Sequence, residues 1–259
     1  MPSEDLHALV SGFADVAAVY ERGRPEYPPA VIDRVVAELG AAARPPARVL
    51  DLGAGTGKLT RPLLAAGLDV VGVEPLERMR AALADAVGAD RALDGRAEAI
   101  PFADAALDGA VCAEAFHWFD GERAADELAR VLAPGAALVI VWLINQGDEG
   151  PWTDEVRALL EPLWARGRHP SIVEGRRAEP IEGHPAFSPV QRSELAFEDH
   201  LDRDGMIAWF SSFSVVGALP DAERAEMLAR VAAIVDRHGA GDRPIRRRWR
   251  ADVRATRRR

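Results

Sequence analysis

The sequence feature that most constrains the fold is an alternation of short apolar runs with amphipathic segments. The apolar runs occupy residues 48–52, 69–73, 107–113 and 137–143, with a shorter candidate near 91–94. Helical patterns lie around and between them, at residues 30–39, 59–66, 76–87 and 121–132. Strands that are apolar on both faces are typical of a parallel sheet covered by helices on both sides. The alternation therefore predicts an α/β fold whose ligands bind at the carboxyl ends of the strands.

The sequence after residue 145 is less regular. It predicts helices at residues 152–164, 205–214 and 221–237 and a strand at 194–200. Residues 166–189 are rich in glycine, proline and charge, and we expect a long loop there, of the kind that often forms a lid. At the arginine-rich end, apolar residues alternate with arginine, which favours a strand over a tail that binds an anionic partner.

Length and composition exclude several classes of protein. The 259 residues, 48% of them apolar, suit one globular domain. No apolar run reaches the roughly 18 residues of a membrane helix, and the first residues are acidic where a signal peptide is basic, so we expect a cytoplasmic protein without membrane contact. The net charge is −9, and it argues against a nucleic-acid partner. One cysteine, Cys112, and the absence of metal-ligand spacing predict no disulfide and no metal.

The glycine-rich segment GAGTG follows the first apolar run directly. A phosphate-binding loop for ATP would need glycine where Leu52 stands and serine or threonine where Leu59 stands. The dinucleotide fingerprint would place its third glycine one position later than Gly57. Neither nucleotide fits, although a glycine trio is weak evidence by itself.

Two acidic residues flank these glycines. Asp51 stands two residues before the first glycine, where a carboxylate repels a pyrophosphate and suits a cationic ligand. Glu74 ends the next apolar run, where an acid can accept both hydroxyls of a ribose. A ligand with a ribose, a positive charge and no phosphate fits S-adenosylmethionine.

The string VLDLGAGTGKLT, followed by VVGVEP, resembles class I S-adenosylmethionine-dependent methyltransferases. Three more segments resemble their small-molecule, UbiE/trans-aconitate methyltransferase-like branch: VYERGRPEYPP, GRAEAIPFADAALDGAVCAEAFHWFD and ELARVLAPGAALVIVW. The resemblance implies a Rossmann-like, mostly parallel seven-stranded sheet with helices on both faces, a C-terminal antiparallel strand and a helical lid. It implies a single domain at 1–259, with the cofactor-binding core at 13–145 and the substrate-covering region and last strands at 146–259.

The resemblance also implies a set of cofactor-binding residues. They are Tyr20, Arg24, Asp51, Gly53, Ala54, Gly55, Thr56, Gly57, Glu74, Pro75, Met79, Ala97, Glu98, Ala113, Glu114 and Phe116. The Arg24 guanidinium would grip the methionine carboxylate, unless Tyr20 and Arg24 only anchor the N-terminal segment. Many relatives carry aspartate where Arg96 or Ala97 stands, so Glu98 is the candidate for the bond to the adenine amine. Glu114 is either a surface acid or part of the site for the methionine amine.

The segment AEAFHWF is expected at the mouth of the site. Candidate substrate-binding residues are Tyr20, His117, Trp118 and Trp142. His117 is a candidate general base, and a structural histidine is the alternative. Phe116 and Trp118 either line the pocket, where aromatic faces stabilise a cation, or fill the core.

These residues predict methyl transfer from S-adenosylmethionine to a small-molecule acceptor, either a secondary metabolite or a small carboxylic acid. The reaction would be an in-line displacement, driven by proximity and desolvation, with S-adenosylhomocysteine as product and no metal. Two alternatives stay open: a non-methylating reaction such as a natural-product cyclisation, and a non-enzymatic binding protein. The sequence makes no prediction of oligomeric state.

Overall fold

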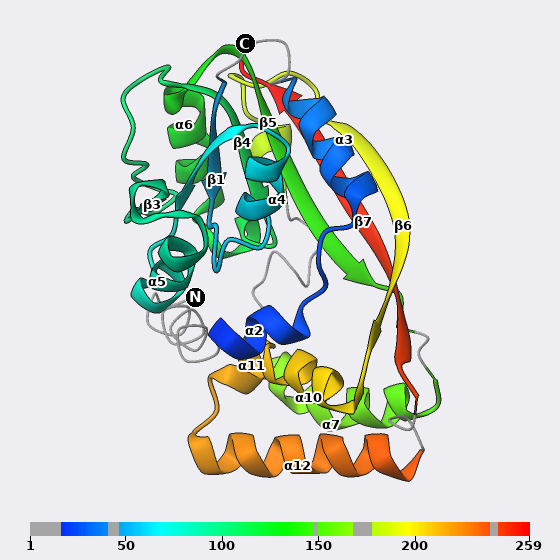
Figure 1. Ribbon diagram of the computed structural model, residues 1–259. Coiled ribbons are helices and arrows are strands. Elements are labelled where there is room, and N and C mark those ends of the chain that lie inside the picture. The colour runs from blue at the N-terminus through cyan, green and yellow to red at the C-terminus, as the bar shows by residue number, and fades with distance from the viewer. Residues whose placement is uncertain (1–16, 41–46, 148–149, 168–177, 239–242) are drawn as a thin grey trace. The chain divides into compact units, whose positions relative to one another are not determined.

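Seven strands form one sheet in the order β3-β2-β1-β4-β5-β7-β6 (Figure 1). The computed structural model describes residues 17–40, 47–147, 150–167, 178–238 and 243–259. The strands are β1 Arg48–Leu52, β2 Asp69–Val73, β3 Ala92–Leu93, β4 Leu107–Ala113, β5 Leu132–Asn145, β6 Gln191–Leu201 and β7 Ile245–Arg257. Strands β3, β2, β1, β4 and β5 pair in parallel. The predicted α/β class with a mostly parallel sheet is confirmed.

Strand β7 runs against its neighbour β5. Gly135 N donates to Arg258 O, whereas Gln146, eleven residues later, donates to Arg248 O. Partner numbers that fall along one strand as they rise along the other define an antiparallel pair. The predicted antiparallel C-terminal strand is therefore confirmed, and the binding-tail alternative for the arginine-rich end is wrong. The apolar side of this strand, including Trp249 and Val253, is buried.

Along the chain, helices precede, connect and follow the strands of the sheet. They are α2 Ala17–Gly23, α3 Pro29–Leu39, α4 Thr60–Ala65, α5 Glu77–Val87, α6 Gly121–Val131, α7 Trp152–Gly167, α9 Glu179–Glu182, α10 Arg203–Ser211, α11 Ser214–Gly217 and α12 Asp221–Arg237, with 3-10 turns η3 Ala89–Arg91 and η4 Phe116–Trp118. Local signals define their ends. A proline opens α3, Gly40 closes it with φ +64°, and the Asp120 carboxylate caps α6 through Arg123 N.

The strand order reverses direction between β1 and β4, and a ligand crevice is expected at this switch point. The chain moves from β1 to β2 through α4 and, in the opposite direction, from β4 to β5 through α6. Since such crossovers are right-handed, α4 and α6 cover opposite faces of the sheet. The loops after β1 and β4 therefore diverge at the sheet edge and leave a crevice between them.

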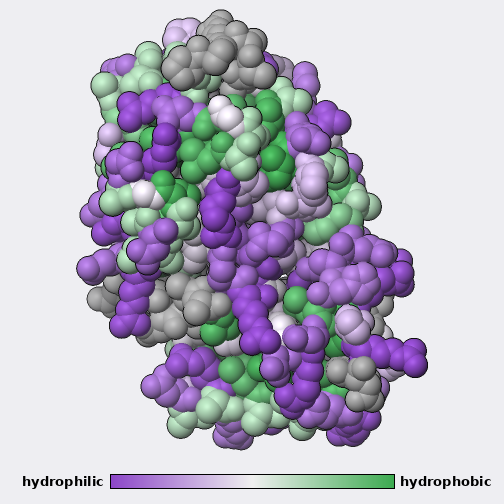
Figure 2. Space-filling model, viewed as in Figure 1, coloured by the Kyte–Doolittle hydropathy of each residue, from purple (hydrophilic) through white to green (hydrophobic). Residues whose placement is uncertain are grey.

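The interior strands are apolar because both of their faces are covered. Val49 and Leu50 of β1 and Val70 of β2 have no exposed surface. Outside, hydrophilic side chains cover much of the face in Figure 2, and apolar ones form smaller patches. Of the helices within the described ranges, none combines the length and apolar character needed to cross a membrane.

The chain forms two compact units. The core unit comprises Glu26–Leu143, Glu174–Leu195 and Ala251–Arg259, and the helical unit comprises Met1–Pro25, Ile144–Val173 and Ala196–Arg250. The predicted division at residue 145, and the single domain as such, stay predictions.

Within the helical unit, α2 packs closely on α10. A Cβ added to Gly23 would lie 2.5 Å from the Ala208 backbone, so the two helices approach each other through this glycine. The guanidinium of the buried Arg247 lies 4.7 Å from the Trp209 ring centroid and 5.0 Å from that of Trp249, and it donates to the Gly23 carbonyl at 3.1 Å. This contact holds the N-terminal helix within its unit.

Two local expectations were wrong. Residues 166–189 do not form one loop, because Pro180 lies in the first turn of the short helix α9, a position where proline is well suited to helical geometry. Residues 168–177 of that predicted loop lie outside the described residues. Strand β5 begins at Leu132 rather than 137, because Pro134 and Gly135 sit at an irregularity of its pairing with β4 and do not end the strand.

Candidate functional site

The loops after β1 and β4 meet at Gly53, within the core unit. This residue has φ +72°, and an added Cβ would lie 2.6 Å from Ala115 Cβ and 3.2 Å from the Phe119 ring. Only glycine allows the two loops to approach this closely. The structure thus brings together Gly53 and Ala115, which are 62 residues apart in the sequence.

The glycine loop is anchored at its base and open at its turn. Gly53 N and Ala54 N both donate to Val73 O, at 2.9 and 3.2 Å, and Gly57 N donates to Ala54 O at 2.9 Å. Gly55 has φ +58°, and no atom of the described residues lies within 4 Å of the position where its Cβ would stand. A ligand can therefore approach the backbone at Gly55.

Asp51 is a buried acid at the end of β1, with 1% of its surface exposed. The Thr60 hydroxyl donates to its carboxylate at 2.6 Å. Burial raises the pKa of Asp51 to about 6, with a further increase from the charge of Glu74 and an opposing effect of the Thr60 bond. No ion pair of the described part of the chain joins Asp51 to a cation, so a cationic ligand would relieve the cost of its buried charge.

Glu74 holds the far side of the glycine loop. Its carboxylate accepts from Gly55 N at 3.0 Å and from Leu76 N at 2.9 Å. Burial raises the pKa of Glu74, while these two N–H groups and the charge of Arg80 oppose the increase. Arg80 also donates to the Glu74 carbonyl at 2.8 Å. The two acids flank the turn at Gly55.

The segment after β3, predicted to contact adenine, is tied to the start of α6. The Glu98 carboxylate accepts from Asp120 N at 2.9 Å and lies 3.6 Å from Arg96 Nε. Ala97 is buried in this segment, and Met79 is buried on α5. The adenine contacts of these residues stay predictions.

After β4 the chain turns at Glu114, which has the unusual φ of +55° for a side-chain-bearing residue. Its amide donates to Val141 O at 2.9 Å, and its carboxylate accepts from Leu143 N. Glu114 thus joins the ends of β4 and β5. Its predicted contact with the methionine amine stays a prediction.

The aromatic residues after Glu114 divide into buried and accessible ones. Phe116 is 2% exposed and packs edge-on against Phe119 at 5.7 Å between ring centroids. His117 and Trp118 are half-buried, with their rings 4.9 Å apart. Phe116 therefore fills the core in this structure, whereas His117 and Trp118 remain accessible to a substrate.

Trp142 is almost fully buried in β5. The Arg254 guanidinium lies 5.3 Å from its ring centroid and is bonded to Glu182 at 2.7 Å. The indole N–H of Trp142 is buried without a hydrogen-bond partner in the described residues. Its packing role is thus visible, and its substrate role stays a prediction.

Tyr20 and Arg24 belong to the helical unit. The Arg24 guanidinium lies 5.4 Å from the ring centroids of both Tyr20 and Phe213, and it donates to Ser212 O at 3.2 Å. These contacts anchor the N-terminal segment. The predicted grip on the cofactor carboxylate stays a prediction.

Two residues at this site were missed by sequence reasoning. Thr60 orients Asp51, and the signal was a hydroxyl nine residues after that acid. Lys58 is the chain's single lysine, and its buried side chain pairs with Glu26. Its isolation among many arginines, directly after the glycine loop, was the signal.

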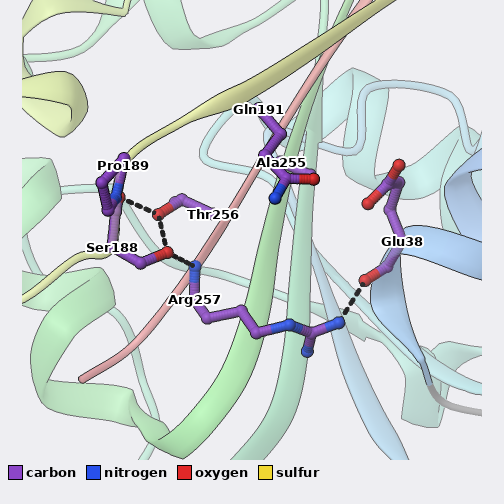
Figure 3. A pocket seen from close by; sticks show the side chains of 7 residues that line it. All are labelled: Glu38, Ser188, Pro189, Gln191, Ala255, Thr256 and Arg257. Carbon is purple, nitrogen blue, oxygen red and sulfur yellow. Dashed lines mark hydrogen bonds between the residues drawn. The ribbon is translucent and has the colours of Figure 1, made fainter.

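A polar hollow lies elsewhere in the core unit (Figure 3). It is lined by Glu38, Ser188, Pro189, Gln191, Ala255, Thr256 and Arg257. Glu38 lies in the last turn of α3, the helix that precedes β1, so the hollow is at the amino edge of the parallel strands and away from the glycine loop. The hydroxyls of Ser188 and Thr256 bond each other at 3.2 Å, and Arg257 donates to Glu38 O at 3.2 Å.

Comparisons with known proteins identify the family of this chain. Residues 50–140 match the family model of the methyltransferase domain. The chain is 40% identical over 229 residues to an uncharacterized methyltransferase of Mycobacterium bovis, covering 88% of this chain and 87% of the relative. It is similar to the structure of a proposed type II methyltransferase from Anaeromyxobacter dehalogenans, with a TM-score of 0.65 and 30% identity over 90% of this chain and 97% of that one.

A demethylmenaquinone methyltransferase of Thermus thermophilus is 42% identical over 108 residues, 39% of this chain and 49% of the relative. The chain belongs to the class I S-adenosylmethionine-dependent methyltransferases. It is an enzyme of that family, and the predicted family and enzyme class are confirmed. The residues around the glycine loop fit the cofactor, because two buried acids and an open backbone suit a cationic nucleoside.

Proposed function

We propose that this methyltransferase acts on a small-molecule acceptor, either a secondary metabolite or a small carboxylic acid, and releases S-adenosylhomocysteine. The observation that carries the cofactor assignment is the pair of buried acids, Asp51 and Glu74, on either side of an open glycine turn. The acidic net charge of −9 supports a small acceptor over a nucleic acid. The name of the Thermus relative, whose printed substrate is demethylmenaquinone, supports it as well.

Each acid has a distinct role in this proposal. Asp51 balances the positive charge of the methionine part, and Glu74 accepts the ribose hydroxyls. Ala97 and Glu98 flank the adenine, and Arg24, with Tyr20, grips the carboxylate. The cofactor supplies an activated methyl group on its sulfonium.

The protein's remaining task is alignment. An in-line displacement needs the acceptor atom behind the methyl group, and water excluded from both. His117, Trp118 and Trp142 would shape the acceptor pocket. His117 would take a proton only from an acceptor that must lose one, such as a phenol, whereas a carboxylate acceptor needs no base. No metal is needed for this chemistry.

Calorimetric titration tests the cofactor site. The protein should bind S-adenosylmethionine and S-adenosylhomocysteine, and neither NAD nor ATP. Asp51→Ala and Glu74→Ala should weaken that binding strongly, while His117→Ala leaves it unchanged. Unchanged affinity in both acid variants would overturn the assignment.

An acceptor screen tests the reaction. The protein is incubated with S-adenosylmethionine and pools of small carboxylic acids or phenols, and released S-adenosylhomocysteine is measured. Product formation with intact S-adenosylmethionine would instead identify a non-methylating reaction. Tight cofactor binding without turnover of any pool would favour a binding protein.

A further inference from the structure

The ion pair of Lys58 and Glu26 in the core unit is strongly asymmetric. The Lys58 side chain is 7% exposed, whereas the Glu26 side chain is 70% exposed. The Glu26 carboxylate accepts a hydrogen bond from the Lys58 ammonium. A buried cation is joined here to an anion that lies largely in solvent.

The two partners depend on each other unequally. A buried ammonium needs a partner, because its desolvation is costly, and removing that partner leaves an uncompensated charge. A carboxylate in solvent is stable by itself. Lys58 therefore requires an anion, and Glu26 supplies one that can leave at little cost to itself.

Lys58 directly follows the glycine loop, which the proposed cofactor would contact. It stands between Gly57 and Thr60, the residue whose hydroxyl holds Asp51. The ammonium and the carboxylate of the cofactor are attached to the same carbon, so a carboxylate follows wherever Asp51 binds the ammonium. Arg80, also near the loop, is occupied by the Glu74 carbonyl and by Asp94 at 3.1 Å.

We propose that Lys58 binds the carboxylate of the cofactor, and that Glu26 occupies this position in the ligand-free protein. This inference rests on the proposed cofactor site. Glu26 is then an internal competitor, whose carboxylate is exchanged on Lys58 for that of the ligand. A carboxylate accepts several hydrogen bonds, so this inference does not replace the role proposed for Arg24.

Two ligands together isolate the contribution of the amino-acid group, which carries the carboxylate, to the binding affinity. S-adenosylhomocysteine carries the amino-acid group, and 5′-methylthioadenosine lacks it. In calorimetry, the Lys58→Met variant should bind S-adenosylhomocysteine about 10- to 100-fold more weakly than the wild type, which is the loss expected for one charge-assisted hydrogen bond. Its affinity for methylthioadenosine should be unchanged. Glu26→Gln should bind S-adenosylhomocysteine more tightly, and methylthioadenosine unchanged. In the double variant, the effect of Glu26→Gln should disappear.

The sign of the Glu26→Gln effect decides between exchange and simple anchoring. If the pair only holds the segment before α3, Glu26→Gln weakens both ligands equally, and the inference is overturned. Unchanged affinity of Lys58→Met for S-adenosylhomocysteine would overturn it too. A wild-type protein that binds neither ligand would refute the proposed cofactor site itself.

Control variants isolate the effect from general damage. Glu38→Gln makes the same chemical change in α3, at the opposite edge of the sheet, and should leave both affinities unchanged. Lys58→Met leaves only a solvated carboxylate behind, so its melting temperature should stay near that of the wild type. If Lys58→Met fails to fold, Lys58→Arg, which keeps the charge but not the compact ammonium, should still shift the affinity for S-adenosylhomocysteine and not that for methylthioadenosine.

Discussion

Replacing Asp51 by asparagine removes a buried charge and keeps the shape of the side chain. Burial raises the pKa of Asp51 from 3.8 to about 6, so the folded protein favours the protonated form. A pKa difference of one between the folded and unfolded protein corresponds to about 1.36 kcal/mol, and the ionised group therefore destabilises the fold by about 3 kcal/mol. This penalty is full above the folded pKa and is lost as the pH falls towards the unfolded value.

The asparagine variant lacks this pH-dependent penalty. Its unfolding free energy, relative to the wild type, should therefore rise by about 2 kcal/mol between about pH 4.5 and 7.5. Any fixed cost of burying the new amide is the same at both pH values and cancels. Urea denaturation at the two pH values measures the difference, and a difference that does not change with pH would refute the assigned pKa.

The same substitution should weaken cofactor binding. Wild-type affinity for S-adenosylmethionine should fall up to about tenfold for each pH unit below about 6, as Asp51 becomes protonated. Calorimetry of Asp51→Asn should show weak binding without this pH dependence. If Asp51→Asn is more stable than the wild type at neutral pH and binds the cofactor more weakly, then the buried charge of Asp51 lowers stability and contributes to binding.

Three further substitutions test the geometry of the loop. At Gly53 φ is +72°, and an added Cβ would lie 2.6 Å from Ala115 Cβ, so Gly53→Ala should destabilise the protein by about 2–5 kcal/mol in urea denaturation. The control is Gly67→Ala, where φ is +88° but no atom of the described residues lies within 4 Å of the added Cβ, and it should cost only about 1–2 kcal/mol. Thr60→Val removes the bond that lowers the Asp51 pKa, so the pH at which cofactor affinity falls should move upwards; an unchanged pH profile would contradict this. Glu74→Gln should weaken S-adenosylhomocysteine about 10- to 100-fold in calorimetry, while the ligand-free melting temperature shifts little.

Local patterns were sufficient for much of the fold and for the outline of the site. The strands at 48–52, 69–73 and 107–113 were predicted with their observed bounds, because continuous apolar runs bounded by turns leave few alternatives. The place of the acids followed from the rule that ligands bind at the carboxyl ends of parallel strands. Asp51 and Glu74 could therefore be selected before any contact was known.

Other features were not visible in local sequence, because they depend on distant partners. The strand through Pro134 and Gly135 exists since β4 and β7 pair on either side of it, which overrides a dipeptide that usually marks a turn. The bond from Leu143 N to the carboxylate of Glu114 was not predicted, because Leu143 lies 29 residues later in the sequence.

The sequence by itself determined the class of fold, the glycine turn and the acids beside it, because these follow from hydrophobic periodicity and residue type over a few positions. Only the tertiary structure decided the state of those groups. The pKa of Asp51 depends on burial by the surrounding core, and the buried ammonium of Lys58 is paired with Glu26, which lies 32 residues earlier. Burial and contacts between distant residues exist only in the folded chain. The protonation and pairing of these side chains therefore depend on the tertiary structure.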